Sequence, residues 1–238
     1  MRFSASKSGL LAACRFPFRE TTPWEESRGQ AAIQGDEFHK RIAPAVDPTC
    51  EGIEKPVTTK WMRERLAHAW MWIAKNKVDG WRAEEAFGYH PETGVGRQLG
   101  FNIAREYAAA GLAPDEIGGS ADISHMEGDC AVTYDWKSGR FISDTTWAQM
   151  DTIALMSARS RGAWSARASI LHVTDRGVEQ TTREYSDVDL WVIAETLRKN
   201  LAEVPDAWPV VSVACDACFC PARAGCEIYQ LSKKENAA

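Results

Sequence analysis

The stretch GGSADISHMEGDCAVTYDWKSGRF, residues 118–141, places acidic residues inside two segments that otherwise resemble strands. We predict that residues 120–125 and 129–137 form a strand pair that turns at Glu127-Gly128. Acids inside a strand pair are unusual, because packing residues are expected there. The function of the chain is therefore sought first in these acids.

The acids of this strand pair are predicted to lie close together. Side chains alternate in direction along a strand, so Asp135 and Lys137 should share one face while Trp136 points to the other. If the turn is tight, the Asp122 carboxylate comes within a few ångströms of Asp135, and the two repel unless a proton or cation lies between them. Mg²⁺ prefers such oxygen ligands, and a lysine beside metal-bound water suggests phosphodiester hydrolysis. The alternative is an exposed Asp135–Lys137 ion pair on an edge strand, with Asp122 starting a turn.

Composition limits the class of protein. The chain has 238 residues, 45% of them hydrophobic, which fits one domain over 1–238. It contains no apolar run long enough to cross a membrane, and its N-terminus does not resemble a secretory signal, so we expect a cytoplasmic protein. The net charge of −5 argues against a broadly basic surface for nucleic acid. Any phosphate-binding surface must then be local, or bound metal ions must supply its positive charge.

The order of predicted elements indicates an α/β fold. In chain order we predict a short helix through Ala13, helices over 30–42 and 58–75, a strand around 81–87, the strand pair, a helix over 146–160, strands over 165–173 and 178–185, and a helix over 187–202. The helix over 30–42 is expected to end before Pro44. This order predicts a mixed sheet flanked by helices, with a helical lobe around 45–78. Glu85 lies on the apolar side of its predicted strand.

Two polar residues on predicted helices could join the acids. Gly35 and His39 are four residues apart and share a helix face, where glycine permits close approach of another backbone and histidine offers a metal ligand. Gln149 lies on the helix expected to pack beside the strand pair. Taken alone, a helical histidine is more often a solvated or core residue, and such a glutamine usually lies on the surface.

The cysteines indicate a second metal site. Of the seven cysteines, four fall within twelve residues near the C-terminus, in a Cys-rich segment over 214–230; they are Cys215, Cys218, Cys220 and Cys226. Clustered thiolates bind zinc or an iron–sulfur cluster. The spacing fits neither a regular zinc ribbon nor a bacterial ferredoxin, so a ligand from elsewhere is plausible, and Cys14 is the candidate. Cys14 could equally be a small buried apolar residue.

Taken together, these motifs give a family resemblance over nearly the whole chain. The chain resembles the RecB-type branch of the PD-(D/E)XK nuclease superfamily, and within it iron–sulfur members such as CRISPR-associated adaptation nucleases, the AddB nuclease domain and phage exonucleases. The motifs are SASKSGLLAACRFPF, GDEFH, GSADI, DWK, Gln149 and the terminal cysteines, in that order. Two features depart from the family: Ile153 replaces a tyrosine four residues after Gln149, and the terminal cysteines are not spaced C-x2-C-x5-C.

The resemblance implies a fold, a set of site residues and an activity. It implies a restriction-endonuclease-like fold whose N- and C-terminal helical parts are joined by a metal cluster. It implies that Mg²⁺ or Mn²⁺ is bound by Asp122, Asp135, the Trp136 carbonyl and His39, that Lys137 activates the attacking water or stabilises the transition state, and that Gln149 belongs to the catalytic set. Glu85 is a further candidate carboxylate. Cys14 with three of the four terminal cysteines would hold a [4Fe–4S] cluster, with structural Zn²⁺ as the alternative.

The implied activity is a metal-dependent DNA nuclease, an exonuclease on single-stranded DNA ends. It would act alone or beside a protein partner in a recombination, phage or CRISPR-type complex. The alternative is a catalytically inactive module with a nuclease fold, which binds DNA or supports assembly of a complex. The complete set of His39, Asp122, Asp135 and Lys137 favours the enzyme, because an active site that had lost its activity would be expected to lack at least one of its charged residues.

Overall fold

A computed structural model describes residues 4–18, 30–53, 56–57, 59–103, 106–138, 142 and 144–206, together with Cys220, Ala222 and Cys226. Its elements in chain order are η1 (Ala5–Lys7), α1 (Ser8–Ala13), η2 (Phe16–Phe18), α2 (Gln30–Val46), α3 (Lys60–Asn76), β1 (Arg82–His90), β2 (Val95–Phe101), β3 (Ile117–Glu127), β4 (Cys130–Lys137), α4 (Asp144–Arg161), β5 (Ser165–Val173), β6 (Val178–Tyr185) and α5 (Asp187–Ala202). Among the described helices, none has both the length and the apolar character required to cross a membrane.

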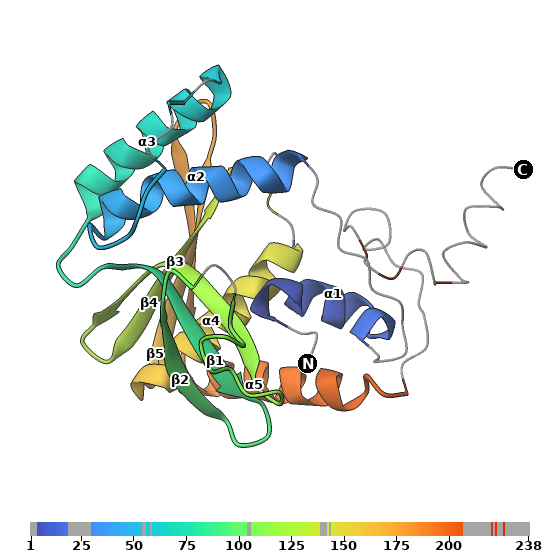
Figure 1. Ribbon diagram of the computed structural model, residues 1–238. Coiled ribbons are helices and arrows are strands. Elements are labelled where there is room, and N and C mark those ends of the chain that lie inside the picture. Colours follow the sequence, from blue (N-terminus) through green and yellow to red (C-terminus); the bar gives the residue numbers. More distant parts are fainter. Residues whose placement is uncertain are drawn as a thin grey trace, which may run out of the picture.

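One six-stranded sheet organises the chain. Its strand order is β2-β1-β3-β4-β5-β6, and its pairs are antiparallel except for the parallel pair of β4 and β5. Helices α2 and α3 cover one face, while α1, α4 and α5 lie on the other (Figure 1). The fold is therefore α/β, with a mixed sheet flanked by helices, as the sequence predicts.

Each face of the sheet has its own hydrophobic cluster. The first cluster joins α1, α4 and α5 to the sheet and includes Leu11, Phe87, Ile153 and Ile170. The second joins α2 and α3 to the opposite face and includes Phe38, Leu66, Ile123 and Trp136. Because β4 supplies Ala131 to the first cluster and Trp136 to the second, it is buried from both sides.

The C-terminal half follows its sequence pattern closely. Helix α5 begins at Asp187 because Ser186 and Asp189 form a capping box, in which each side chain bonds the backbone of the other residue. Strands β5 and β6 and helix α5 have the predicted bounds. In this part of the chain, local signals and tertiary packing agree.

Two elements differ from the prediction. Helix α2 passes Pro44 and ends at Val46. Proline removes the hydrogen bond to the carbonyl of Lys40, but the final turn still closes through the bond from Asp47 N to Ala43 O, at 2.9 Å. Strand β2 was not predicted, because it is an edge strand whose apolar residues Val95 and Phe101 are exposed.

Helix α1 crosses the start of α4 at close range. The Ser8 and Thr152 hydroxyls are hydrogen-bonded at 2.7 Å, and a Cβ added at Gly9 would lie 2.6 Å from Thr145 Cα. Gly9 therefore sets the separation of the two helices. Gly35 does not have the packing role predicted from its spacing to His39, since a Cβ there would meet no described atom within 4 Å.

These two glycines give opposite stability predictions. Gly9→Ala should lower the free energy of unfolding by about 1–3 kcal/mol, because the methyl group overpacks the α1–α4 contact. Gly35→Ala should raise it by about 0.5–1 kcal/mol, because alanine is the better residue inside a helix. Urea denaturation of both variants measures the difference. Equal stability of the Gly9→Ala protein and the wild type would contradict the close crossing.

Candidate functional site

The site forms where β3 and β4 stop pairing. Their register runs from Glu127–Cys130 to Ile123–Tyr134, and the next pair, Asp122 and Asp135, is not part of the ladder. The Trp136 amide instead donates to Asp122 Oδ2 at 2.6 Å. The Asp122 side chain thus replaces a backbone acceptor at the point where the strands diverge.

Asp135 and Lys137 share a face of β4, as strand alternation predicts. Lys137 Nζ lies 2.6 Å from Asp135 Oδ2, and the Asp135 side chain is only 3% exposed. Gln149 on α4 spans the pair: its amide nitrogen donates to Asp135 Oδ1 at 3.4 Å, and its amide oxygen accepts from Lys137 Nζ at 3.5 Å. The structure therefore excludes the alternative of an exposed ion pair on an edge strand.

His39 reaches the acids from the other side of the sheet. Its Nδ1 lies 3.1 Å from Asp122 Oδ1 and 4.0 Å from Glu84 Oε1. The neighbouring Phe38 is fully buried and packs edge-on against Trp136, with ring centroids 6.2 Å apart, which fixes α2 against β4. The structure thus brings together the predicted residues His39, Asp122, Asp135, Lys137 and Gln149; their roles stay predictions.

Mutual electrostatics explain how buried charges coexist here. Burial raises the pKa of Asp122, but His39, with help from Lys137 and the Trp136 amide, outweighs burial and holds this pKa below its ordinary value. Burial also raises the pKa of Asp135, and the negative charge of Asp122 raises it further, against the opposing effect of Lys137. The charge of Asp122 thus acts on Asp135, while the predicted approach of the two carboxylates to a few ångströms stays a prediction.

The carboxylate of Glu84 was not predicted as part of the site. Sequence alternation instead selected Glu85, and this assignment is wrong. Glu85 points away from the site into a buried ion pair with Arg161 at the end of α4, and it also accepts a hydrogen bond from Ser124. Its side chain is 5% exposed, so Glu85 is a structural residue. Glu84 has φ of +50°, and a backbone conformation this rare for glutamate has no reliable signal in the sequence.

The side chains fit a hard divalent cation. One ligand atom each from His39, Glu84 and Asp122 lies within 4.8 Å of the other two. Carboxylate oxygens and an imidazole nitrogen suit Mg²⁺ or Mn²⁺ when water completes the shell. Trp136 adjoins the group through its amide, while a role for its carbonyl oxygen stays a prediction.

Three of the five predicted cluster cysteines are among the described residues. Cys14 follows α1 and is buried, whereas Cys220 and Cys226 are half-buried. Cys215 and Cys218 lie outside the described residues. Arg15 binds Asn200 and Glu203, which places the end of α1 beside the end of α5. Ligation of a cluster by these cysteines stays a prediction.

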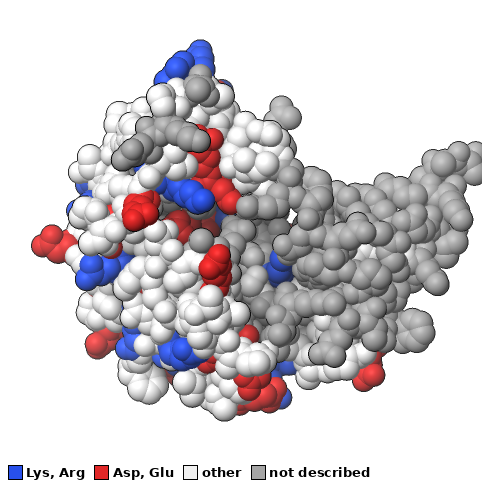
Figure 2. Space-filling view, in the orientation of Figure 1, with Lys and Arg blue, Asp and Glu red and all other residues white. Residues whose placement is uncertain are grey.

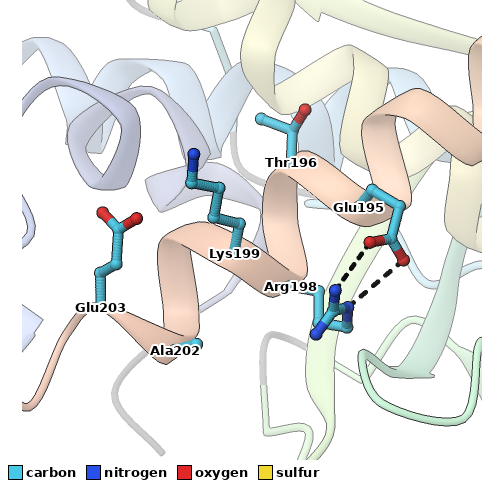
Figure 3. Close-up of a pocket in the computed structure, with 6 residues that line it drawn as sticks. All are labelled: Glu195, Thr196, Arg198, Lys199, Ala202 and Glu203. Atoms are coloured by element: carbon cyan, nitrogen blue, oxygen red, sulfur yellow. Dashed lines mark hydrogen bonds and ion pairs between the residues drawn. The ribbon is translucent and has the colours of Figure 1, made fainter.

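The surface away from the acids offers weaker candidates. A depression of about 470 Å³ on α5 is lined by Glu195, Thr196, Arg198, Lys199, Ala202 and Glu203 (Figure 3). Glu195 pairs with Arg198 there, so opposite charges already neutralise each other. Acidic and basic side chains are intermixed on the described part of the face shown in Figure 2. No site residue lines the α5 depression.

The residue four positions after Gln149 is Ile153, where the resemblance leads one to expect a tyrosine. Ile153 is fully buried in the first hydrophobic cluster. The residue four positions after Gln149 therefore contributes to the core of this protein, and it supplies no polar group to the acids.

Comparison with known proteins assigns no family. No protein-family model matches the chain, and no curated protein matches it. Among solved structures, one described as "Crystal structure of SSO0001" is similar with a TM-score of 0.30 and 14% sequence identity. The similarity covers 45% of this chain and 52% of that chain. A likeness this weak carries no argument about fold or function.

The charge on His39 gives a prediction for the metal-free protein. Burial lowers the pKa of His39, but Asp122 and, less strongly, Glu84 and Asp135 raise it to about 9. The pKa of His39 measured by NMR should therefore be near 9, and Asp122→Asn should lower it towards the ordinary histidine value. Because the folded pKa is raised, this stabilisation is complete below pH 6.5, the ordinary histidine pKa, and is lost as pH rises through about 9. An unchanged His39 pKa in Asp122→Asn would contradict the pairing.

The structural role of Glu85 gives a second prediction. Glu85→Ala should lower the free energy of unfolding by roughly 3–5 kcal/mol, because it leaves the Arg161 guanidinium buried without its partner. The double variant Glu85→Leu/Arg161→Met should recover much of this loss in urea denaturation. If the Glu85→Ala protein were as stable as the wild type but unable to bind Mn²⁺, Glu85 would instead be a residue of the metal site.

Proposed function

We propose that this protein is a metal-dependent DNA nuclease with a restriction-endonuclease-like fold, acting as an exonuclease on single-stranded DNA ends. The observation that supports this most directly is the convergence of His39, Asp122, Asp135 and Lys137 from three separate elements of the fold. Buried acids, a lysine and an imidazole in direct contact are costly to a fold, and such groups concentrate at functional sites.

The acids and His39 are proposed to hold the cation. Asp122 and Asp135 supply carboxylate oxygens, His39 supplies an imidazole nitrogen, and the Trp136 carbonyl is the further predicted ligand. When bound, Mg²⁺ or Mn²⁺ supplies a Lewis acid for the phosphate and lowers the pKa of a coordinated water. The protein contributes the fixed ligand positions, because Asp122 is already held by the Trp136 amide.

Lys137 is proposed to act on the transferring phosphate. Its side chain is 27% exposed, and its amine is held between Asp135 and the amide oxygen of Gln149. A charge fixed in this way stabilises negative charge that develops in the transition state without first having to reorganise. Gln149 acts as a positioning residue, since it contacts both members of the pair.

The cysteines are proposed to hold a [4Fe–4S] cluster, with structural Zn²⁺ as the alternative. The ligands would be Cys14 and three of the four terminal cysteines. The proximity of α1 and α5 supports this assignment. Cys220 and Ala13 also pack against the same first hydrophobic cluster. Such a group would link the two ends of the chain, and purified protein would be brown with iron and colourless with zinc.

Replacement of the lysine tests the proposed activity. Lys137→Ala should lower the rate of Mg²⁺- or Mn²⁺-dependent cleavage by roughly a hundredfold or more, with little loss of folding or DNA binding, because its charge acts mainly in the transition state. Asp135→Ala should also lose activity and additionally weaken metal binding. The assay uses anaerobically purified protein and end-labelled single- and double-stranded DNA, with chelator as the negative control.

Lys75→Ala is the matched control, since this exposed lysine lies in the last turn of α3. It should cleave like the wild type. Cleavage by Lys137→Ala at near wild-type rate would reject the catalytic role. DNA binding without metal-dependent cleavage by the wild type would favour the inactive DNA-binding module instead.

A further inference from the structure

The alternation of side chains between the two faces of the sheet is interrupted in β1 at Glu84. Ala83 packs into the second hydrophobic cluster, whereas Phe87 packs into the first, although residues four apart on a regular strand share a face. The change coincides with φ of +50° at Glu84. The side chain of Glu84 is therefore aimed by a local break in β1.

The alternation of side chains is also interrupted in β3, at the position that matches Glu84. Ala121 belongs to the first cluster and Ile123 to the second. The pairing of β1 with β3 joins Ala83 to Ile123 and Glu85 to Ala121, so Glu84 and Asp122 occupy the intervening positions on their strands. Both strands thus depart from regular alternation where they carry an acid.

The backbone of Glu84 is held in this conformation at a cost. A residue with a Cβ is strained at positive φ, and glycine would meet the same backbone requirement without that strain. The Glu84 carbonyl accepts the Asn102 amide at 2.9 Å, which fixes the break. Strain of this kind persists where the surrounding structure enforces it.

The distances around Glu84 match a coordination shell. Octahedral ligands at about 2.1 Å from Mg²⁺ lie about 3.0 Å apart when adjacent and about 4.2 Å apart when opposite. His39 Nδ1 lies 3.1 Å from Asp122 Oδ1 and 4.0 Å from Glu84 Oε1. All three ligand atoms lie within 4.8 Å of one another.

We propose that Glu84 is a further ligand of the divalent cation held by His39 and Asp122, and that the break in β1 exists to aim its carboxylate at that cation. The inference rests on the proposed function for the identity of the ion as Mg²⁺ or Mn²⁺. It adds a ligand from β1 to those from α2 and β3. Its test uses metal binding and needs no nuclease activity.

The test compares Glu84→Gln and Glu84→Gly by calorimetric titration with Mn²⁺ and by the Mn²⁺ EPR signal. Both variants should bind Mn²⁺ at least about tenfold more weakly than the wild type, because each loses one charged ligand. Mn²⁺ should also raise the Tm of the wild type more than that of either variant. In the metal-free protein Glu84→Gly should be at least as stable as the wild type, since it relieves the strain.

Glu179→Gln is the matched control: Glu179 lies on the edge strand β6 with 71% of its side chain exposed, and its loss should leave Mn²⁺ affinity unchanged. Wild-type affinity in either Glu84 variant would overturn the proposal, as would absence of Mn²⁺ binding by the wild type. A wild type that binds Mn²⁺ and does not cleave DNA would reject the nuclease function alone.

Discussion

The placement of one buried carboxylate, that of Asp122, constrains the centre of this structure. One of its oxygens accepts the Trp136 amide, and the other faces His39. These contacts connect β3, β4 and α2 at a point where the strand ladder has ended. A buried carboxylate is tolerated only when its charge and its hydrogen bonds are satisfied, so Asp122 adds a polar contact to the hydrophobic contacts that hold α2 over the sheet.

The departures from regular sheet geometry lie next to the same acid. β3 changes the cluster to which it contributes between Ala121 and Ile123, and β1 does so between Ala83 and Phe87. Each of these two strands therefore contributes to the second hydrophobic cluster on one side of its acid and to the first hydrophobic cluster on the other side. This arrangement brings acids from neighbouring strands together without exposing either hydrophobic cluster. It also separates Glu84 from Glu85, which is neutralised by Arg161 on the opposite side.

The sequence predicted those parts of the structure in which local pattern and packing coincide. Helix α5 has a capping box at Ser186, and β4 alternates regularly, which placed Asp135 and Lys137 on one face. The α/β class and the meeting of His39 with the acids could likewise be predicted. The choice between Glu84 and Glu85 could not, because alternation assumes an unbroken strand and Glu84 has positive φ. Edge strand β2 lacked a signal because it buries little apolar surface.

Charge balance explains why these acids require more than hydrogen bonds. Glu84, Asp122 and Asp135 gather around one imidazole and one lysine, and Lys137 is committed to Asp135 and Gln149. His39 offsets part of this negative charge, and the carboxylates raise its pKa to about 9, chiefly through Asp122. A proton on His39 satisfies this balance in the metal-free protein. Under the proposed function the cation replaces that proton, so proton and metal compete for the same ligand nitrogen.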